Sequence, residues 1–192
     1  MKPWLTNPAP QAEAFAAALS SSVPSIETAR LVLRPCKLSD WPVLEPIWTT
    51  DQARFIGGPM TAEDAWLDFN QCLSSWFLRG TGALAITTHD SDTPLGIVVI
   101  MHEYGDPELE LGWLITKDAE GNGYATEAAE ALLDWTFRQL GVTQMVSYVH
   151  ANNVKSANLA TRLGGVLRPE GHPAWDNCLV FEHRRPTKGA EK

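Results

Sequence analysis

The stretch that decides the fold reads EGNGYATEAAEALLDWTFRQLG, residues 120–141. Two glycines, Gly121 and Gly123, let the backbone take positive φ angles and bring its N–H groups close to a ligand. Because Asn122 is a favoured N-cap residue, the spacing predicts a helix that starts at about Gly123. Gly141 supplies the stop. The residues at helical spacing on one face, expected to be buried, are Ala125, Ala128, Ala129, Leu132, Leu133, Thr136 and Leu140. The free amides and positive dipole end of such a helix favour a phosphorylated ligand.

Two common phosphate-binding loops do not fit this stretch. A nucleoside-triphosphate loop needs four residues between its glycines and a following Lys-Ser or Lys-Thr pair, neither of which the sequence has here. The dinucleotide fingerprint needs a third glycine where Thr126 stands, and the segment lies far into the chain. An ordinary loop followed by an ordinary helix is the alternative unless other parts of the chain agree.

Length and composition bound the architecture. A chain of 192 residues, 44% of them hydrophobic, has the material for one well-cored domain. The formal net charge of −8 argues against nucleic-acid binding as the main task, because binding to a polyanion depends on clustered Lys and Arg. A cationic amine substrate is compatible with this acidic balance.

The sequence favours a cytoplasmic protein without a bound metal. Its three cysteines, Cys36, Cys72 and Cys178, are widely spaced and lack a metal-ligand pattern, which fits reduced thiols. No apolar run approaches the roughly 20 residues that span a bilayer. The Ala-rich piece near the N-terminus makes a poor signal peptide, because its apolar core is brief. We therefore expect neither a membrane partner nor a metal site.

Residue periodicity divides the chain into elements. Residues 1–25, rich in Pro, Ala and Ser, are expected to form a tail or a short helix, residues 26–186 a single domain, and residues 187–192 a C-terminal tail. Helices are expected at about 39–50, capped by Ser39-Asp40, at 61–78, capped by residues 61–64 from Thr61 on, and at 123–140 and 154–163. Strands are expected at about 28–35, 82–88, 96–102, 108–116, 145–149, 166–168 and 178–183, with a turn at residues 90–94 between the second and third. Aromatic residues at helical spacing are mostly core. That interpretation is favoured for Trp66, Phe69, Trp76 and Phe77, and the alternative is that they line one wall of a substrate site.

Several motifs together resemble one superfamily. Thr28–Arg34 resembles a first strand written T-x-R-L-x-L-R. Glu120–Ala125 resembles a cofactor loop with Gln or Arg, two free positions, Gly, one free position and then Gly or Ala, preceded by a strand similar to Glu108–Trp113. Asn153–Ser156 and Arg162–Gly164 resemble the start and the end of the next helix. These motifs are similar to those of the GNAT acyltransferases, specifically the branch of ribosomal-protein (Rim-type) N-terminal acetyltransferases.

The resemblance covers residues 26–186 and implies a fold and an activity. The implied fold is α/β (α+β), a GNAT-like mixed, mainly antiparallel, twisted sheet of six to seven strands with helices on both faces. The implied reaction is acetyl transfer from the co-substrate acetyl-CoA to a primary amine by direct attack. No cysteine has an activating motif that would make it a covalent nucleophile. The acceptor stays open between a protein N-terminus and a small amine, and the oligomeric state between monomer and homodimer.

The resemblance also implies a site for acetyl-CoA. In the family, two strands splay apart, so that backbone N–H groups of the first strand pair with the pantetheine arm, while the glycine loop holds the pyrophosphate. Two polar residues at the start of the following helix face the same arm. The implied cofactor-binding residues are Leu114, Ile115, Thr116, Glu120, Gly121, Asn122, Gly123, Tyr124, Ala125, Thr126, Asn153 and Ser156.

Glu110 is the candidate base. It matches the strand glutamate to which related enzymes assign water-mediated deprotonation of the amine. A carboxylate on an otherwise apolar strand has its pKa raised by the loss of solvent, which moves it toward useful basicity. A surface or ion-paired glutamate, held by an arginine of the first strand, is the plainer interpretation. Glu108 is a second, weaker candidate.

Two positions depart from the family's pattern. Glu120 places a carboxylate where a neutral or cationic side chain is usual. Ala160 stands where many members have the tyrosine that protonates the leaving thiolate. Ser156 is therefore a catalytic candidate as the acid, beside a water molecule or direct departure of the thiolate. The departures also permit a different function, a non-catalytic acyl-CoA-binding sensor or regulatory module of the same fold.

Further residues have weaker claims on the site. Lys117, Lys155 and Arg162 are candidates for the ribose phosphate of CoA, although solvated surface charge explains each of them. His150 ends a strand near the expected acceptor, where it is either a base or a structural residue. The pair Trp175–Asp176, before the last strand, is expected to shape the acceptor pocket.

Overall fold

The computed structural model describes residues 2–186, so the C-terminal tail expected at 187–192 lies outside the described residues. Eight strands form one sheet, in the spatial order β1-β2-β3-β4-β5-β6-β8-β7. All neighbours are antiparallel except β5 and β6, which are parallel. The strands are β1 (Ile26–Glu27), β2 (Leu31–Pro35), β3 (Ala83–Thr88), β4 (Ser91–Met101), β5 (Glu110–Ile115), β6 (Gln144–His150), β7 (Val166–Leu167) and β8 (Cys178–Arg184).

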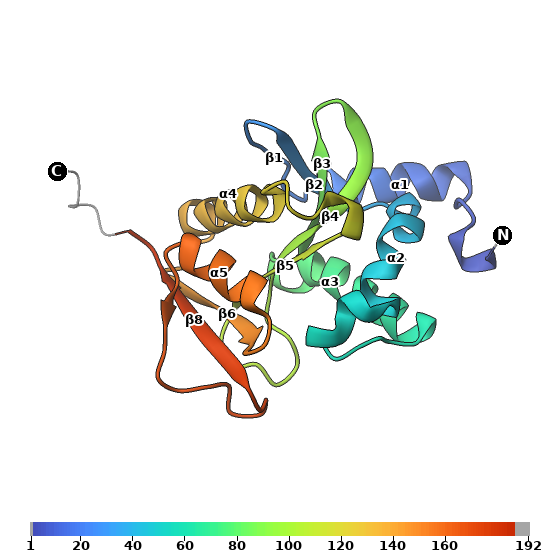
Figure 1. Cartoon of the computed structure of the whole chain (residues 1–192). Coiled ribbons are helices and arrows are strands. Elements are labelled where there is room, and N and C mark those ends of the chain that lie inside the picture. The colour runs from blue at the N-terminus through green and yellow to red at the C-terminus, as the bar shows by residue number, and fades with distance from the viewer. Residues whose placement is uncertain (1, 187–192) are drawn as a thin grey trace.

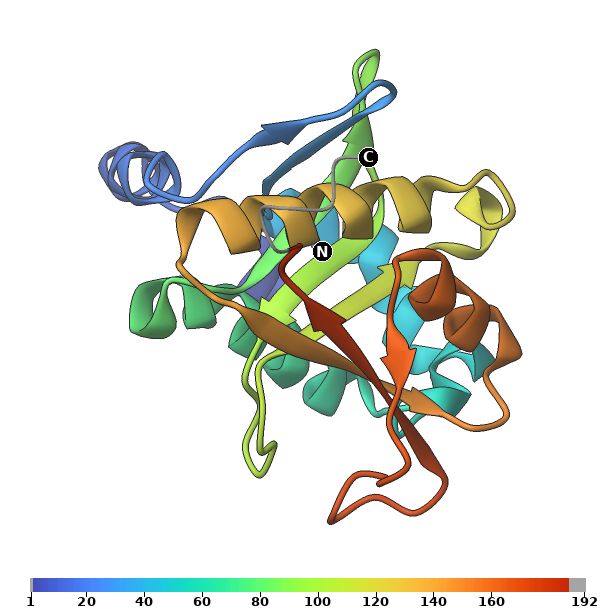
Figure 2. The same ribbon diagram turned by 90° about the vertical axis from the view of Figure 1, so that its left-hand side faces the viewer.

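Helices cover both faces of this sheet, which confirms the expected α/β (α+β) architecture (Figure 1). In Figure 2, α4 lies on one face, and α2 and α3 lie on the other. The α-helices are α1 (Pro10–Ser20), α2 (Trp41–Thr49), α3 (Ala62–Arg79), α4 (Tyr124–Gln139) and α5 (Val154–Arg162). Short 3-10 helices are η1 (Pro3–Leu5), η2 (Leu38–Asp40), η3 (Asp51–Phe55) and η4 (Lys117–Ala119).

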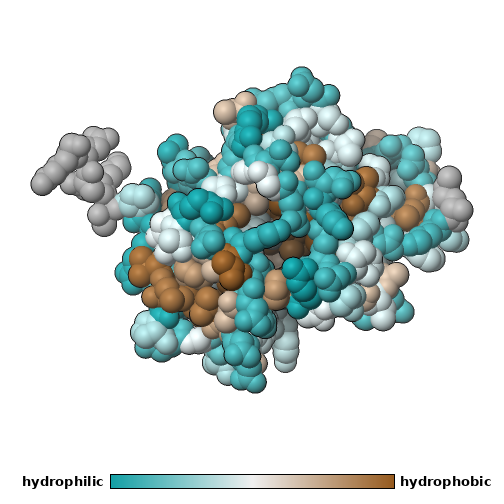
Figure 3. All heavy atoms as spheres, in the orientation of Figure 1, coloured by the Kyte–Doolittle hydropathy of each residue, from teal (hydrophilic) through white to brown (hydrophobic). Residues whose placement is uncertain are grey.

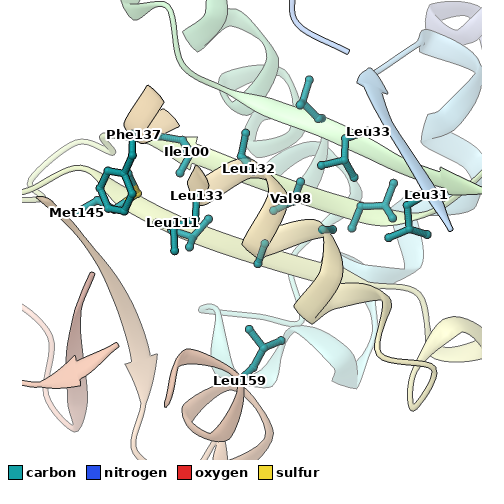
Figure 4. Packing of buried hydrophobic residues seen from close by; sticks show 14 residues of the cluster. Leu31, Leu33, Val98, Ile100, Leu111, Leu132, Leu133, Phe137, Met145 and Leu159 are labelled. Atoms are coloured by element: carbon teal, nitrogen blue, oxygen red, sulfur yellow. The ribbon is translucent and has the colours of Figure 1, made fainter. Parts of the chain in front are cut away.

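Alternating side chains of the central strands supply two cores. Leu84 and Val98 belong to the cluster packed against α4, whereas their neighbours Ala83 and Ile97 belong to the cluster packed against α2 and α3. This alternation follows from the two-residue period of a strand, because successive side chains point to opposite faces. Figure 4 shows Leu132 of α4 among the strand residues of the first cluster. The sheet is therefore buried on both faces at its centre.

The helix α4 begins where the sequence predicts, but with a different cap. Gly123, with φ of 78°, is the N-cap residue of α4. Asn122 does not cap the helix, because its side-chain amide donates instead to the carbonyls of Ala119 and Glu120, at 3.2 Å each. At the other end, Leu140 was expected on the buried face but is 37% exposed.

The start of α2 also differs from the expectation of a side-chain cap at Ser39-Asp40. Asp40 is buried, and its carboxylate accepts hydrogen bonds from Arg34 at 2.8 and 2.9 Å and from the backbone N–H of Lys37 at 2.7 Å. The buried guanidinium of Arg34 therefore binds the Asp40 carboxylate, which the sequence predicted to cap α2. By contrast, the Thr61 hydroxyl accepts from the N–H of Asp64 at the start of α3, as expected.

The sheet differs in extent from the sequence prediction in two places. The two-residue strand β1 adds an eighth strand to the six or seven expected. β4 begins at Ser91 rather than at Gly96, because Ser91 already pairs with Thr88 and the expected turn at residues 90–94 is shorter. The helix α1 lies in the stretch expected to be a tail or short helix, and none of its residues is buried. Within residues 2–186, every helix is too short or too polar to cross a membrane.

We expect Leu132→Ala to lower the free energy of unfolding by about 2–5 kcal/mol, because Leu132 is fully buried between α4 and the sheet and its loss leaves a cavity. Urea unfolding followed by circular dichroism measures this change. The matched control is Leu78→Ala, since Leu78 on α3 is 81% exposed and its loss removes little packing. Equal destabilisation by both substitutions would show that the α4 face is not a core.

Candidate active site

The site begins where β5 and β6 part. The two parallel strands pair at Glu110 and Val146, where the N–H of Val146 donates to Leu109 at 2.9 Å. One residue further along, the hydroxyl of Ser147 donates to the carbonyl of Leu111 at 2.7 Å. Beyond that point no strand pairing joins β5 to β6 in the described part of the chain. A cavity of about 1150 Å³ occupies the region between them.

A buried histidine supports the base of this divergence. His183 of β8 lies 3.1 Å from the hydroxyl of Ser147 through its Nε2. Since the single hydroxyl proton of Ser147 goes to Leu111, the histidine nitrogen must donate. Burial lowers the pKa of His183 to about 4, so the ring is neutral at ordinary pH. The hydrogen-bonded chain therefore ties β8, β6 and β5 together at the point where the last two separate.

Hydrogen-bond register decides which β5 amides face the cavity. The N–H of Thr116 donates to Leu95 at 2.8 Å, and its hydroxyl donates to the same carbonyl at 3.0 Å. Directly opposite residues of antiparallel strands alternate between bonded and non-bonded pairs. Leu114 therefore also directs its N–H to β4, while Trp113 and Ile115 direct theirs away from it. Of the expected residues Leu114, Ile115 and Thr116, only Ile115 offers an amide on the cavity side.

The glycine loop provides free amides at the start of α4. Gly121 and Gly123 have φ of 81° and 78°, in the left-handed region that favours glycine. No backbone N–H from Gly121 to Thr126 donates to an acceptor within residues 2–186, whereas the next one, that of Glu127, bonds to the carbonyl of Gly123. A row of unpaired amides at the positive end of a helix fits a pyrophosphate. These residues therefore suit the phosphates of CoA.

Most of the residues expected in the site line one cavity. Thr116 and Asn122 do not line it, since their polar groups bond to Leu95 and to the loop backbone. The expected residues that do line it are Glu110, Leu114, Ile115, Glu120, Gly121, Gly123, Tyr124, Ala125, Thr126, Asn153 and Ser156. Figure 3 looks onto this face, where hydrophobic atoms show between hydrophilic rims.

The unusual Glu120 has a cationic partner. The ammonium group of Lys155 on α5 lies 2.6 Å from the Glu120 carboxylate. This ion pair joins the glycine loop to the first turn of α5, and both residues line the cavity. Arg162 also lines it and approaches the Thr126 hydroxyl at 3.4 Å, whereas Lys117 does not line it. The negative charge of Glu120 is thus balanced next to the unpaired amides.

The first turn of α5 presents one free hydroxyl to the cavity. The side chain of Asn153 accepts from the N–H of Ser156 at 3.2 Å, so Asn153 is the N-cap of α5. The Ser156 hydroxyl forms no hydrogen bond with another described residue, and Ser156 lines the cavity. Ala160, one turn further on, is fully buried and has no proton to give.

Glu110 sits at the point of divergence in an acidic environment. Burial, together with the nearby charges of Glu103 and Asp106, raises the pKa of Glu110 to about 8, although a hydrogen bond from the backbone of Tyr148 works against this. No ion pair to Glu110 occurs among the described side chains. The sequence allowed an ion pair between Glu110 and an arginine of residues 28–35. Arg30 and Arg34, however, bind other carboxylates.

Glu108 has a different environment from Glu110. Arg168 forms an ion pair with Glu108, and its Nη2 donates to the carboxylate at 3.0 Å. The hydrogen bond from Arg168 lowers the pKa of Glu108, and Gln144 donates a second hydrogen bond. Arg168 thus neutralises Glu108, while Glu110 faces the cavity without a cation.

The end of the cavity near Glu110 includes two carboxylates that the sequence analysis did not predict. Asp68 on α3 and Glu103 after β4 both line it. Burial raises the pKa of Glu103 to about 7, with help from the charges of Asp68 and Asp106. Burial likewise raises the pKa of Asp68, whose carboxylate accepts from the indole of Trp48 at 2.6 Å. Neither residue stands in a motif, and only tertiary folding brings them to Glu110.

Aromatic residues surround this end. His150 stacks on Phe55 with ring centroids 5.3 Å apart, and Trp175 packs 5.8 Å from Tyr148. All four line the cavity, as does Asp176. The N–H of Asn152 donates to His150 Nδ1, so a neutral His150 ring carries its proton on Nε2. We call this end of the cavity the mouth. It combines these aromatic rings with the carboxylates of Asp68, Glu103 and Glu110.

The aromatic residues of α3 belong elsewhere. Phe69 is buried in the core, and Trp66 and Trp76 pack against core clusters, as expected. Phe77 is 63% exposed, contrary to the expectation of a core position. None of them lines the cavity in the described part of the chain. No group of three or more His, Cys, Asp and Glu side chains within residues 2–186 is placed to hold a metal ion.

A cavity between two parting strands, beside the start of a helix, matches the arrangement that the sequence motifs implied for an acetyl-CoA enzyme. A family model, the acetyltransferase (GNAT) domain, matches residues 30–166. That match spans most of the chain, and the chain belongs to this family of acetyltransferases. It is therefore an enzyme of the transferase class.

Individual relatives agree with this assignment. An acetyltransferase from Agrobacterium tumefaciens str. C58 has a similar crystal structure, with 37% identity and a TM-score of 0.81 over 85% of this chain and 95% of that one. The uncharacterized N-acetyltransferase YnaD of Bacillus subtilis (strain 168) is 26% identical over 162 residues, 79% of this chain and 92% of YnaD. RimL, a ribosomal L7/L12 alpha-N-protein acetyltransferase solved with coenzyme A, is 15% identical with a TM-score of 0.67 over 84% of this chain and 98% of RimL, which shows a shared fold alone.

We expect the Glu110 carboxyl to make stability fall as pH rises. Its folded pKa of about 8 exceeds the ordinary value of 4.5, so between these values the unfolded chain has lost a proton that the folded protein keeps. Deprotonation therefore favours unfolding, and the effect disappears below about pH 4.5. Urea unfolding at several pH values should show Glu110→Gln gaining stability relative to wild type as pH rises. A difference that is independent of pH would contradict the raised pKa.

Proposed function

We propose that this protein transfers the acetyl group of acetyl-CoA to a primary amine, with Glu110 as the base. The observation that carries the proposal is the position of Glu110. It lies where β5 and β6 part, in the same cavity as the free amides of the glycine loop and the acidic, aromatic mouth. A base at the mouth, on the side that faces the glycine loop, can reach an amine that enters there.

Each end of the cavity has its own task. The amides from Gly121 to Thr126 would hold the pyrophosphate, and the cavity-facing amides of Trp113 and Ile115 would pair with the pantetheine arm. When bound, the thioester supplies a carbonyl carbon to which the amine nitrogen adds and from which the sulfur leaves. An amide that stabilises the developing oxyanion is typically worth about 2.7–4 kcal/mol in acyl transfer.

Glu110 would take the proton of the incoming ammonium group through a water molecule. A base works best when its pKa lies near the working pH, and the raised pKa of Glu110, about 8, meets that condition. The leaving thiolate needs a proton, and the hydroxyl of Ser156 is the nearest candidate in the first turn of α5. Ala160 has no proton to donate, so the alternatives to Ser156 are a water molecule that protonates the thiolate or departure of the thiolate without protonation.

The mouth favours a positively charged acceptor. Asp68, Glu103 and Glu110 line it without a cationic partner among the described residues, and Trp175 adds an aromatic face. Ammonium groups bind well between carboxylates and aromatic rings. A protein N-terminus and a small amine both carry such a group. Initial rates on N-terminal peptides and on free amines separate these acceptors, and activity on free amines alone would exclude the peptide.

We place the active domain at residues 26–186, with residues 1–25 as an appended segment. We also propose a cytoplasmic enzyme, monomeric or homodimeric, that needs no metal. Cys36, Cys72 and Cys178 are all free thiols, which agrees with a reducing compartment.

We expect acetyl-CoA to bind with micromolar affinity, about −8 kcal/mol, because the unpaired amides at the start of α4 match its pyrophosphate. Calorimetric titration with acetyl-CoA, CoA and ATP measures this. ATP is the control for phosphate binding in general, and it should not bind at the same concentrations. If acetyl-CoA released no heat at several temperatures, the cavity would not be a cofactor site.

We expect Glu110→Gln to lower kcat by about 100-fold or more, because a positioned base typically contributes 10²–10⁴-fold. Acetyl-CoA affinity should stay unchanged, since the glycine loop is intact. Glu108→Gln tests the second candidate and should retain most activity, because Arg168 already holds its carboxylate. Glu130→Gln, on the exposed face of α4, is the surface control.

A non-catalytic acyl-CoA-binding module is the alternative that Glu120 and Ala160 permit. It would bind acetyl-CoA in the titration but show no turnover with any amine. In that case Glu110→Gln would leave both binding and the absent turnover unchanged. Turnover that depends on Glu110 would exclude the module.

A further inference from the structure

Arg30 reaches from the turn between β1 and β2 to the glycine loop. Its Nη1 donates to the carbonyl of Asn122 at 3.0 Å, and its Nε donates to the carboxylate of Glu127 at 2.7 Å. The guanidinium carbon lies 4.9 Å from the ring centre of Tyr124. One side chain therefore contacts the loop, the first residue of α4 and its first turn.

The turn itself is fastened to the same carboxylate. The hydroxyl of Thr28 and the backbone N–H of Arg30 both donate to Glu127 Oε1, at 2.6 and 2.9 Å. The Glu127 side chain is 18% exposed, and that of Arg30 is 51% exposed. Arg30 does not itself line the cavity. Its influence on a ligand must therefore pass through the loop.

Planarity of the peptide bond gives this contact a direction. The carbonyl of Asn122 and the N–H of Gly123 belong to one trans peptide unit and point in opposite directions. Because Arg30 holds the carbonyl on the β2 side, the N–H of Gly123 points to the other side. Gly123 lines the cavity, and its N–H has no acceptor within the described residues. By holding the Asn122 carbonyl, Arg30 thus directs the N–H of Gly123 into the cavity.

The same side chain cancels a local charge. Glu127 lies in the first turn of α4, where a carboxylate stabilises the helix but repels an approaching phosphate. The Arg30 Nη2 lies 2.6 Å from the Glu127 carboxylate. The helix keeps its favourable acidic residue, while the ion pair reduces the repulsion.

We propose that Arg30 is a positioning residue for the phosphate-binding loop, acting on the bound phosphates through the Asn122 carbonyl and the Glu127 carboxylate. The inference rests on the proposed use of acetyl-CoA. It predicts that Arg30 strengthens binding of the phosphate-bearing half of acetyl-CoA and does not affect binding of the thioester end. If Arg30 only held the β1–β2 turn against α4, its loss would destabilise the fold and weaken binding of both halves of acetyl-CoA equally.

The test compares acetyl-CoA with S-acetylpantetheine, which lacks the nucleotide and its pyrophosphate. Dissociation constants are measured by calorimetry for acetyl-CoA and by ligand-observed NMR titration for S-acetylpantetheine. Arg30→Gln should weaken acetyl-CoA binding about tenfold or more, as expected for losing charge-assisted hydrogen bonds. S-Acetylpantetheine binding should change by less than about twofold, well within the scatter of single surface contacts.

The matched control is Arg138→Gln on the same helix, where Arg138 pairs with Asp134 at 2.8 Å on the exposed face. It should leave both dissociation constants unchanged. Arg30→Lys keeps the charge but lacks the fork that reaches two acceptors at once, so it should also weaken acetyl-CoA binding selectively. It supplies the comparison if Arg30→Gln does not fold, as judged by thermal melting.

Two results would overturn the inference. One is acetyl-CoA affinity in folded Arg30→Gln equal to that of Arg138→Gln. The other is equal weakening of both ligands. Failure of the wild-type protein to bind acetyl-CoA is a separate outcome, because it would remove the proposed function before Arg30 is tested.

Discussion

The separation of two neighbouring strands is the constraint on which the rest of the molecule depends. β5 and β6 pair at Glu110 and Val146, and a chain of hydrogen bonds from His183 through Ser147 to Leu111 fixes the place where they part. A sheet normally satisfies every interior N–H and C=O with a neighbouring strand. Parting the strands leaves cavity-side backbone groups of β5 without a strand partner. The Gln52 side chain donates to the Ile115 carbonyl at 3.3 Å, and the N–H groups of Trp113 and Ile115 are left for a ligand or water. The cavity is thus an opening in the sheet itself, lined by backbone as well as by side chains.

Charge is distributed unevenly along this opening. At one end, the amides of the glycine loop, the dipole of α4 and the cations Lys155 and Arg162 favour phosphate, with Glu120 held by Lys155. At the other end, Asp68, Glu103 and Glu110 favour a cation. Burial raises the pKa values of Glu103 and Glu110, and the charges of neighbouring carboxylates, Asp106 among them, add to the effect. Under the proposed function, this polarity directs an anionic donor and a cationic acceptor to opposite ends, so that they meet at Glu110. The protein's net charge of −8 does not reveal this polarity, because it sums both ends.

Local pattern predicted the elements, and tertiary contacts decided the details. The 3.6-residue period of α4 and the alternation of β3, β4 and β5 are properties of neighbouring residues, so the helix, the strands and the mixed sheet were predictable. Asp40 was assigned to a helix cap because the pattern shows no distant partner, yet Arg34 holds it. The amide that faces the cavity at Ile115 rather than Thr116 depends on the register with β4. Asp68 and Glu103 come from separate elements, and nothing in their own segments indicates that they share a cavity with Glu110.

The two ends of the cavity depend on connecting segments in different ways. The glycine loop at one end leads directly into α4, which packs on the sheet, whereas Glu103, Trp175 and Asp176 at the other end come from connecting segments beyond β4 and before β8. Connecting segments tolerate substitution and insertion far better than packed elements do. If the proposed function holds, descendants of this chain can exchange one amine for another by altering those segments, while the acetyl donor stays the same.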